Sequence, residues 1–554
     1  MRTERTNPGA GGTAAVAGPT SVLLTLASAQ FLMTLDSSVM NVSIATVAKD
    51  IGTTVTGVQT AITMYTLVMA SLMITGGKIG QMIGRKRAFA LGCVIYGAGS
   101  FTTALAPNLG VLLLGWSLLE GIGAALILPA IVALVASAFE PAGRPRAYGV
   151  VAASGAIAVA AGPLIGGLLT TYASWRWVFA GEVVVVAGIL LLTGRLPNQE
   201  SQPARLDVVG TILSATGLGL VVFGILRGGE WGFVVPKPDA AAWLGVSMVV
   251  WIVASGLAVL AAFLKWETRQ TAHGRPSLLD PAMVQNQVLR GGLMSFFFQY
   301  LLQSGMFFTV PLFLSVALGL SAVDTGLRIM PLSVTLFIAA IGIPRLFPDA
   351  SPRRVVRLGF LGLLAGIVTL MGALDFGVGP EVVTWPLLFA GLGIGALASQ
   401  LGSVTVSSVA EEQAPEVGGL QNTVANLGAS IGTALAGAVL VSGLTTSFLA
   451  GVQNNDAIPV DLASQAEVEL SGGVPFLSDQ DLRDALDDAG VAGATATAIL
   501  EENEVSRLHG LRIALAVLAL LAVLALCFTG RIPTRQPRAD EPEAPTHPLL
   551  QEPT

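Results

Sequence analysis

Charged residues are scarce in this chain of 554 residues. Asp, Glu, Lys and Arg make up only 12% of it, whereas 53% of its residues are hydrophobic. Ordinary soluble domains carry about 25% charged residues. So low a share excludes an ordinary soluble domain, and the composition predicts an integral membrane protein.

Cysteine and histidine are also rare, with two and three copies respectively. Cys93 and Cys527 lie in apolar segments, which indicates neither a disulfide framework nor a metal site. No Walker-type phosphate loop and no nucleophile–base pair is found, so we expect neither ATP as the energy source within this chain nor an enzyme. A basic patch with interleaved aromatic residues is missing too, which argues against nucleic acid as a partner. We expect no cofactor and no metal.

What the chain has instead is a series of long apolar runs separated by short polar turns. A transmembrane helix needs about 20 apolar residues. We expect fourteen such helices, at 20–48, 55–80, 87–106, 109–139, 146–172, 177–195, 207–227, 241–266, 288–318, 324–345, 355–374, 382–409, 417–449 and 510–530. The 65 glycines suit helices that pack backbone to backbone in lipid. The predicted fold class is all-α integral membrane.

The spacing of these runs predicts two groups of six helices with two helices inserted between them. In chain order we expect a tail at 1–19, a six-helix bundle at 20–196, a linker with two extra transmembrane helices at 197–284, the helices of a C-terminal bundle at 285–450, an acidic extracytoplasmic loop at 451–509, a last transmembrane helix at 510–530 and a tail at 531–554. Lys and Arg gather in loops on the side of the N-terminus, and such residues mark the cytoplasmic side. Both termini are therefore expected in the cytoplasm, with the first span left uncleaved.

The segment 451–509 holds twelve acidic side chains against only Arg483 and Arg507. Its stretch SDQDLRDALDDAG predicts a short capped helix that ends at Gly490. Two interpretations stay open for this segment. It is a solvated acidic cap, or it gathers cations near the outer face.

Asp36 lies near the middle of the first apolar run and is followed by Ser37, Ser38 and Asn41. A carboxylate at mid-membrane depth costs roughly 2.5–3.5 kcal/mol, so such a residue faces a protein interior or a water-filled cavity. This placement indicates a site for an ion or a substrate. The alternative is a core aspartate that neighbouring hydroxyl groups hold in place.

Two further acids fall inside apolar runs. Glu120 comes one helical turn after Trp116 and on the same helix face. Glu182 lies about 9 Å in helical rise beyond Arg176, so an interfacial ion pair between them is an alternative. We expect Asp36, Glu120 and Glu182 to be candidates for proton coupling, with Asp36 first and Glu120 second.

Amide and aromatic residues repeat at helical spacing in two of the later segments. Gln299, Gln303 and Phe307 share one face, and Asn422 and Asn426 share another. Such stripes also arise from packing and interhelical hydrogen bonds, but facing a cavity they bind amphipathic molecules. The expected substrate-contacting set is Phe31, Asn41, Trp116, Gln299, Tyr300, Gln303, Phe307, Asn422 and Asn426.

Several motifs resemble those of the major facilitator superfamily. The segment GKIGQMIGRKR at 77–87 looks like the loop between its second and third helices. The stretch LDSSVMNVSIA around Asp36 and the stretch GAIAVAAGPLIGG at 155–167 are similar to two further motifs. WRWVFAGEV at 175–183 and VGGLQNTVANLGASIGTALAG at 417–437 also fit. Together they resemble the fourteen-helix drug:proton antiporter family, which implies a major facilitator fold of two six-helix bundles plus two inserted linker helices.

The resemblance also implies roles for two groups of residues. It implies a gating loop with Gly77, Gln81, Gly84, Arg85, Lys86 and Arg87, and an antiporter helix with Gly162, Pro163, Gly166 and Gly167. The loop has a second interpretation as a topology anchor, and the helix as close packing that has no bearing on direction. The chain departs from the family pattern at Gln81, usually acidic, at Ser117, commonly Arg, and at Glu182, often Asn.

The implied function is proton-coupled efflux of amphipathic, cationic drugs or toxic small molecules by alternating access. The partners are then a small-molecule substrate, protons and the lipid bilayer, and we expect a monomer in the cell membrane of a bacterium. The main alternative is a dedicated exporter of one endogenous metabolite, antibiotic or lipid-like product. A membrane sensor or scaffold without transport is a remote third hypothesis.

Overall fold

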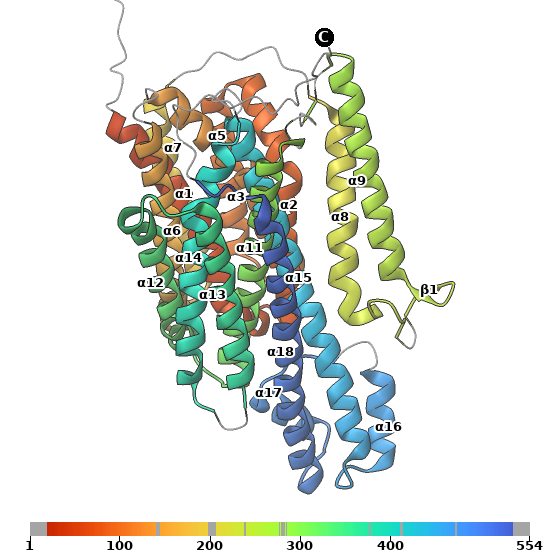
Figure 1. Cartoon of the computed structure of the whole chain (residues 1–554). Coiled ribbons are helices and arrows are strands. Elements are labelled where there is room, and N and C mark those ends of the chain that lie inside the picture. The colour runs from red at the N-terminus through yellow and green to blue at the C-terminus, as the bar shows by residue number, and fades with distance from the viewer. Residues whose placement is uncertain are drawn as a thin grey trace, which may run out of the picture.

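The computed structural model describes residues 19–139, 144–197, 206–237, 240–275, 277–278, 283, 285–375, 378–409, 414–470 and 474–535. Long helices run side by side through most of the molecule, and the α8/α9 pair stands at one side of them (Figure 1). The helices α16 and α17 lie at the same end of the molecule. We call this end the α17 end.

The first half of the chain forms a helical bundle, and its elements are α1 (Pro19–Asp50), α2 (Val55–Ile83), α3 (Arg85–Ala104), α4 (Leu109–Leu112), the π-helix η1 (Leu113–Glu120), α5 (Gly121–Ala138), α6 (Arg144–Tyr172), α7 (Arg176–Leu192) and the 3₁₀ turn η3 (Thr193–Arg195). The inserted pair consists of α8 (Val208–Trp231) and α9 (Met248–Ala272), joined through the short strands β1 (Ala242–Trp243) and β2 (Val246–Ser247). These strands pair antiparallel, with Ala242 opposite Ser247.

The second half forms a second bundle followed by the acidic segment, and its elements are α11 (Gln287–Leu312), the π-helix η4 (Phe313–Ala317), α12 (Ala322–Leu346), α13 (Pro352–Ala373), the 3₁₀ turn η5 (Pro380–Val383), α14 (Thr384–Val406), α15 (Ala414–Asn454), α16 (Val460–Glu469), α17 (Asp479–Asp488), α18 (Ala494–Phe528) and the 3₁₀ turn η7 (Thr529–Arg531). The bundles meet where α2 contacts α15 and where α6 contacts α12. The α8/α9 pair packs through α8 against α2 and α15.

The described helices confirm an all-α membrane fold, although they do not settle the count of fourteen. Twelve are long and apolar enough to cross a membrane, and α6 is a thirteenth if its two parts, bent by 41°, are counted as one. The helix α3 is not among them. The fourteenth span therefore stays a prediction.

Both halves of the chain end their last long helix in the same way. Thr193-Gly194-Arg195 and Thr529-Gly530-Arg531 each form a 3₁₀ turn. Lys86 donates to the carbonyls of Gly194 and Leu196, both at 3.1 Å, and Arg353 donates to the carbonyl of Ile532 at 2.7 Å. The two halves thus repeat one arrangement. In each half, a basic residue at the start of the third long helix (α3 or α13) donates to the chain just after the sixth (α7 or α18). This supports the expected repeat of two six-helix groups.

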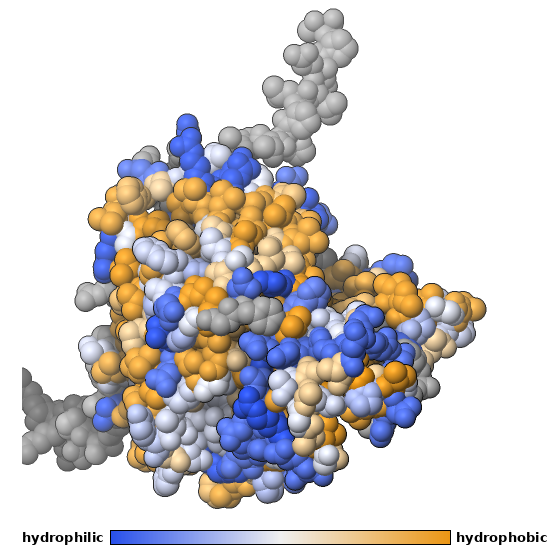
Figure 2. Space-filling view, turned by 90° about the horizontal axis from the view of Figure 1, so that it is seen from below, coloured by the Kyte–Doolittle hydropathy of each residue, from blue (hydrophilic) through white to orange (hydrophobic). Residues whose placement is uncertain are grey.

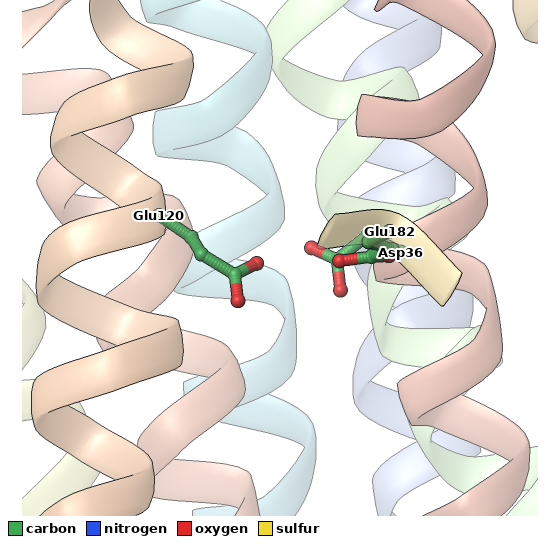
Figure 3. A group of neighbouring side chains, drawn as sticks. All are labelled: Asp36, Glu120 and Glu182. Carbon is green, nitrogen blue, oxygen red and sulfur yellow. The ribbon is translucent and has the colours of Figure 1, made fainter. Parts of the chain in front are cut away.

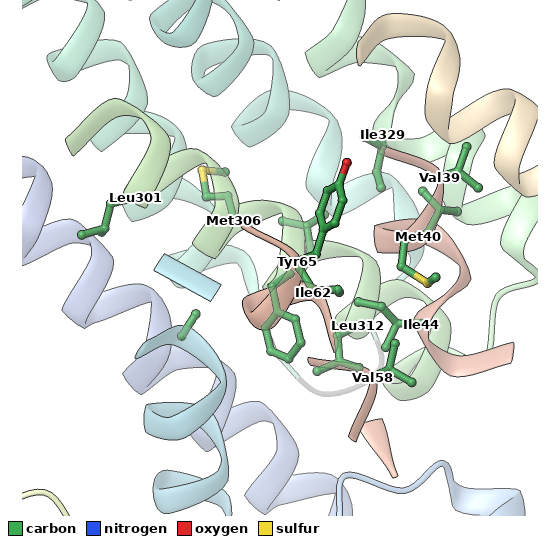
Figure 4. Close-up of a cluster of buried hydrophobic side chains, with 14 of the residues drawn as sticks. Val39, Met40, Ile44, Val58, Ile62, Tyr65, Leu301, Met306, Leu312 and Ile329 are labelled. Carbon is green, nitrogen blue, oxygen red and sulfur yellow. The ribbon is translucent and has the colours of Figure 1, made fainter. Parts of the chain in front are cut away.

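Apolar side chains join the two bundles toward the α17 end. Figure 4 shows Ile44 of α1, Val58 of α2 and Leu312 of α11 in one buried cluster. Beside it, the Gln59 amide donates to the carbonyls of Thr433 and Ala434 at 2.9 Å and 3.3 Å. These contacts close the molecule at the α17 end.

The acidic segment is more helical than the sequence predicts. We expected a loop over 451–509, but α15 runs on to Asn454 and α18 already begins at Ala494. The predicted short helix is confirmed as α17, with Ser478 as its N-cap and Gly490 at φ +71° just beyond it. Viewed from the α17 end, hydrophilic side chains cover much of the centre, and apolar ones dominate the rim (Figure 2).

Two ion pairs tie α17 to the bundles. Arg507 of α18, only 1% exposed, donates to Asp479 at 2.5 Å and to the Leu477 carbonyl at 2.8 Å. Lys49 at the end of α1 pairs with Asp481 at 3.3 Å. The Ser478 hydroxyl and the Lys49 ammonium hold the pKa of the Asp481 carboxyl below its usual range. The segment therefore touches both bundles.

Candidate functional site

The three acids predicted from the sequence come together inside the first bundle. Asp36 of α1, Glu120 of η1 and Glu182 of α7 are 1%, 0% and 2% exposed, and one oxygen of each lies within 4.8 Å of the others. Figure 3 shows Glu120 approaching from one side and Asp36 and Glu182 from the other. Among the described residues, none of them forms an ion pair with Lys, Arg or His. Carboxylate oxygens so close together can share protons or surround one small cation.

The carboxyl of Asp36 accepts hydrogen bonds from the indole ring of Trp116. Trp116 donates its ring N–H to both oxygens of Asp36, at 2.9 Å and 3.0 Å. The Trp116 ring stacks on the ring of Tyr65, with centroids 5.1 Å apart and an angle of 13° between the planes. The donor within hydrogen-bond distance of Asp36 is thus an indole N–H, and the hydroxyl groups of Tyr65 and Tyr96 also lie close to this carboxyl.

The π-helix η1 positions Trp116 and Glu120. Its wider turn places Trp116, Ser117 and Glu120 in the interior, all at most 2% exposed. π-helical turns are rare and are found frequently at functional sites. Ser117, which stands where the superfamily commonly has Arg, donates to the Ala61 carbonyl of α2 at 2.8 Å. This hydrogen bond fixes η1 against α2.

Glu182 is not an interfacial residue, so the expected alternative of an ion pair with Arg176 is wrong. Glu182 accepts hydrogen bonds from Ser100 at 3.0 Å and from Tyr96 at 3.4 Å, both on α3. Arg176 pairs with Asp50 instead and donates to the Ala106 carbonyl at 2.8 Å. The second oxygens of Glu120 and Glu182 have no hydrogen-bond partner among the described residues.

A cavity of about 200 Å³ lies between the bundles and beside the acids. It is lined by Gln30, Met33, Thr34, Ser37, Ser38, Asn41, Ile62, Tyr65, Thr66, Met69, Trp116, Leu128, Val159, Tyr300, Gln303, Ser304, Phe307, Asn426, Ala429 and Thr433. None of these residues is charged. Pockets for drug-sized ligands hold about 300–1,000 Å³. The cavity therefore has to widen before it accepts such a molecule.

The expected substrate-contacting residues divide between the cavity and its surroundings. Six of them line it, namely Asn41, Trp116, Tyr300, Gln303, Phe307 and Asn426. Phe31, Gln299 and Asn422 are not among the lining residues. Phe31 packs against the apolar core, Gln299 is buried at 3% exposure, and Asn422 donates to the Gly418 carbonyl at 3.0 Å.

Sequence reasoning identified Asn41 but missed the rest of the polar stripe that α1 presents to the cavity. Gln30, Thr34, Ser37 and Asn41 follow one another at steps of four, three and four residues, which is one face of a helix. That spacing was a usable signal. Tyr65 was missed as well, because a single tyrosine in an apolar helix carries no pattern.

The predicted gating loop lies at the opposite end from α17. Gly84 has φ +91° and separates α2 from α3, a conformation that glycine adopts without strain. A second hollow, of about 70 Å³, opens between this loop and α15. Gly77, Lys78, Gln81 and Arg85 line it on one side, and Gly419 and Leu420 on the other.

The predicted antiporter helix is a close-packed seam. A Cβ on Gly162 or Gly166 would meet Ser38 or Val39 of α1, and one on Gly167 would meet the backbone of α12. The small residues of α6 therefore let α1 and α12 approach closely. Whether they also set the direction of transport stays a prediction.

Two helical bundles around an uncharged cavity, with acids buried beside it, fit the architecture of an alternating-access membrane carrier. Residues 26–433 match the family model described as Major Facilitator Superfamily, and the chain belongs to this family. It is a multi-pass membrane transporter rather than an enzyme.

Several proteins of similar sequence are named as drug exporters or resistance proteins. The chain is 31% identical over 447 residues to the puromycin resistance protein pur8 of Streptomyces alboniger, covering 79% of this chain and 85% of the relative. It is 29% identical to the probable actinorhodin transporter of Streptomyces coelicolor, covering 86% of this chain and 81% of that one. It is 25% identical to the multidrug efflux pump LfrA of Mycolicibacterium smegmatis, covering 92% and 95%. These similarities support efflux transport across a bacterial membrane.

Solved structures share the fold. A bacterial homologue of the human lysosomal transporter Spinster, solved in an inward-facing and unoccupied conformation, aligns with a TM-score of 0.56 at 16% identity, covering 94% of this chain and 99% of that one. A peptide transporter POT in complex with sulfate aligns with the same TM-score at 15% identity, covering 93% and 96%.

Proposed function

We propose that this protein exports amphipathic small molecules from the cytoplasm in exchange for protons. The observation that carries this proposal is the acid triad, Asp36, Glu120 and Glu182, which is buried beside the cavity and has no basic partner in the described part of the chain. Two charges 4.8 Å apart repel by about 3.5 kcal/mol at an effective dielectric constant of about 20. The triad therefore holds protons rather than three negative charges.

The hydrogen bonds favour one distribution of these protons. The indole N–H bonded to both oxygens of Asp36 favours the ionised form of this carboxyl. The free oxygens of Glu120 and Glu182 are satisfied when these two groups carry protons that the neighbouring acids share. Protons then enter from one side of the membrane and leave on the other as the bundles alternate.

The positions of two basic residues support the proposed orientation in the membrane. Lys86 and Arg353 lie at the end opposite α17, and basic residues mark the cytoplasmic side. The α17 end, with its acidic segment, then faces outside, and both chain termini face the cytoplasm. The apolar cluster and the Gln59 hydrogen bonds described above then join the two bundles on the outer side of the cavity.

The lining of the cavity suits amphipathic aromatic compounds. Trp116, Tyr65, Tyr300 and Phe307 offer ring faces, and amide and hydroxyl groups surround them. Because no charged residue lines the cavity, a cationic substrate is bound best when its charge is delocalised over rings. Direct competition between substrate and proton for Asp36 is not supported, because Trp116 and Tyr65 separate this carboxyl from the cavity.

Transport of ethidium into proteoliposomes with an acidic interior tests the proposal. Wild type should accumulate ethidium while the proton gradient lasts, without ATP, and Asp36→Asn should reduce this at least tenfold. The matched control is Asp207→Asn, because Asp207 also accepts an indole N–H, from Trp266 at 2.8 Å, but lies on the α8/α9 pair. Normal gradient-driven transport by Asp36→Asn, or transport driven equally well by a sodium gradient, refutes the proposal.

The relatives favour a second candidate, a dedicated exporter of one antibiotic. Several of them carry names tied to single compounds, among them puromycin, actinorhodin and tetracenomycin C. A transport panel that includes puromycin, polyaromatic antibiotics and simple cations separates the two. A dedicated exporter accepts one scaffold, whereas a multidrug carrier accepts several.

A further inference from the structure

Trp116 stands in the wall between the cavity and the acids. It lines the cavity together with Tyr65, whereas Asp36, Glu120 and Glu182 do not. On its other edge, its N–H reaches both oxygens of Asp36. Among the described lining residues, Tyr65 also brings its hydroxyl close to Asp36, but only Trp116 forms a hydrogen bond of 3.0 Å or less to one of the three acids. Trp116 is therefore the direct link between the cavity and the triad.

The indole can serve only one acceptor. Tryptophan has a single N–H donor and no acceptor. Its bond to Asp36 is strong when the carboxyl is ionised, because hydrogen bonds to charged groups are roughly twice as strong as neutral ones. When Asp36 gains a proton, this bond weakens and the ring is freed. The state of Asp36 is thus transmitted to the orientation of a side chain that lines the cavity.

Other groups that titrate face Asp36 from the neighbouring helices. They are Tyr65 of α2, Tyr96 of α3, Glu120 of η1 and Glu182 of α7. From α6 and α11, which also pack against α1, the cavity lining brings Val159, Tyr300, Gln303, Ser304 and Phe307, none of them charged. A change of charge in the triad therefore reaches the cavity through Asp36 and its indole.

We propose that Trp116 is the positioning residue that couples the substrate to the proton, and that the substrate class is a planar aromatic compound stacked against the Tyr65–Trp116 pair. This rests on the proposed function. A substrate ring stacked there holds Trp116 in the orientation that donates to Asp36, which favours the ionised carboxylate. A proton that arrives on Asp36 from Glu120, Glu182 or water weakens the bond, and the released indole swings into the cavity and displaces the substrate.

The link works in both directions. If substrate favours the ionised Asp36, then protonation of Asp36 lowers the affinity for substrate by the same factor. A charge-assisted hydrogen bond exceeds a neutral one by an amount that corresponds to about a tenfold change in affinity. Substrate binding then releases protons from those molecules in which Asp36 was protonated, at most one from each, and these protons return when substrate leaves. Exchange transport requires this opposition, in which the binding of a proton and the binding of substrate disfavour each other.

The test measures ethidium binding to the purified full-length protein in detergent, at pH 6 and pH 8, together with proton release in weakly buffered solution. Wild type should bind about tenfold more weakly at pH 6 and should release protons when ethidium is added. Trp116→Phe keeps a ring against Tyr65 but lacks the N–H. It should still bind ethidium, with less than about twofold change between the two pH values and no proton release.

The matched control is Trp266→Phe, which removes an indole donor to Asp207 far from the cavity and should behave as wild type. Replacement of Trp116 with 3-benzothienylalanine keeps the bicyclic ring and removes only the N–H, so it gives the answer if Trp116→Phe does not fold. A wild type without pH-dependent binding or proton release refutes the proposed function itself. A coupled wild type with an equally coupled Trp116→Phe or benzothienylalanine variant overturns the role of Trp116 alone.

Discussion

Removal of the Gln59 side chain should open the molecule at the α17 end. This amide, 2% exposed, lies where α2 meets α15, and its nitrogen donates to the carbonyls of Thr433 and Ala434 at 2.9 Å and 3.3 Å. Both hydrogen bonds cross from one bundle to the other. They exist only while the bundles are closed at this end, so Gln59→Ala weakens the closed state selectively.

The size of the effect follows from these two bonds. A neutral hydrogen bond contributes about 1 kcal/mol net, because water replaces it when it breaks. Two of them amount to about 2 kcal/mol, which changes the ratio of closed to open molecules by about 30-fold. The apolar cluster of Figure 4 is unchanged in the variant and continues to favour closure.

Distances between spin labels at Pro107 and Glu381 measure this opening. Both residues are exposed and lie at the α17 end, one in each bundle. The Gln59→Ala variant should show a larger share of long distances than wild type in lipid nanodiscs. The control is Gln453→Ala, which removes a surface hydrogen bond to Glu467 at 2.8 Å and should leave the distribution unchanged. An unchanged distribution in Gln59→Ala would show that these hydrogen bonds do not hold the outer side closed.

Three further outcomes are expected. Ser478, the cap of α17, and Lys49 lower the pKa of Asp481, so the ionised Asp481 stabilises the contact between α1 and α17 at neutral pH. This stabilisation is lost as the pH falls below about 4, and spin labels on α1 and α17 should then move apart. Constant distances would contradict the assignment. The variant Glu120→Gln should reduce the number of protons released per bound ethidium, measured with a pH dye, whereas an unchanged number would remove Glu120 from the coupling group. Lys86→Ala and Arg353→Ala should each lower the melting temperature by a few degrees, since about 1 kcal/mol of helix-end bonding is lost in each. Equal melting of variants and wild type would show that these contacts contribute nothing.

The sequence was sufficient to find the helices and the acids. Long apolar runs have few alternatives to a membrane helix. A carboxylate inside such a run is costly enough that it needs a protein partner. For these reasons Asp36, Glu120 and Glu182 were identified one by one.

Their meeting point was not predictable in the same way. It depends on the packing of α1, η1 and α7, which lie far apart in the chain. Glu182 was ambiguous because a helix that is apolar on all sides has no pattern that shows which face points inward. The π-helical turn that presents Trp116 to Asp36 has no sequence signature that we recognise. The same lack of pattern applies to Gln299, which we expected beside Gln303 on the cavity face, whereas only Gln303 lines the cavity of this structure.

The absence of any charge in the cavity lining has a bearing on how resistance spectra evolve in such carriers. A cavity without fixed charges does not select its substrates by the sign of their charge. It selects them by shape, by the area of their aromatic rings and by the free-energy cost of removing water from their polar groups. Exchanges among Ile62, Met69 and Phe307 then widen or narrow the range of compounds without touching the energy supply. In the proposed mechanism, cargo selection and ion coupling meet at the two edges of Trp116, whereas the rest of the lining can change without altering the acids.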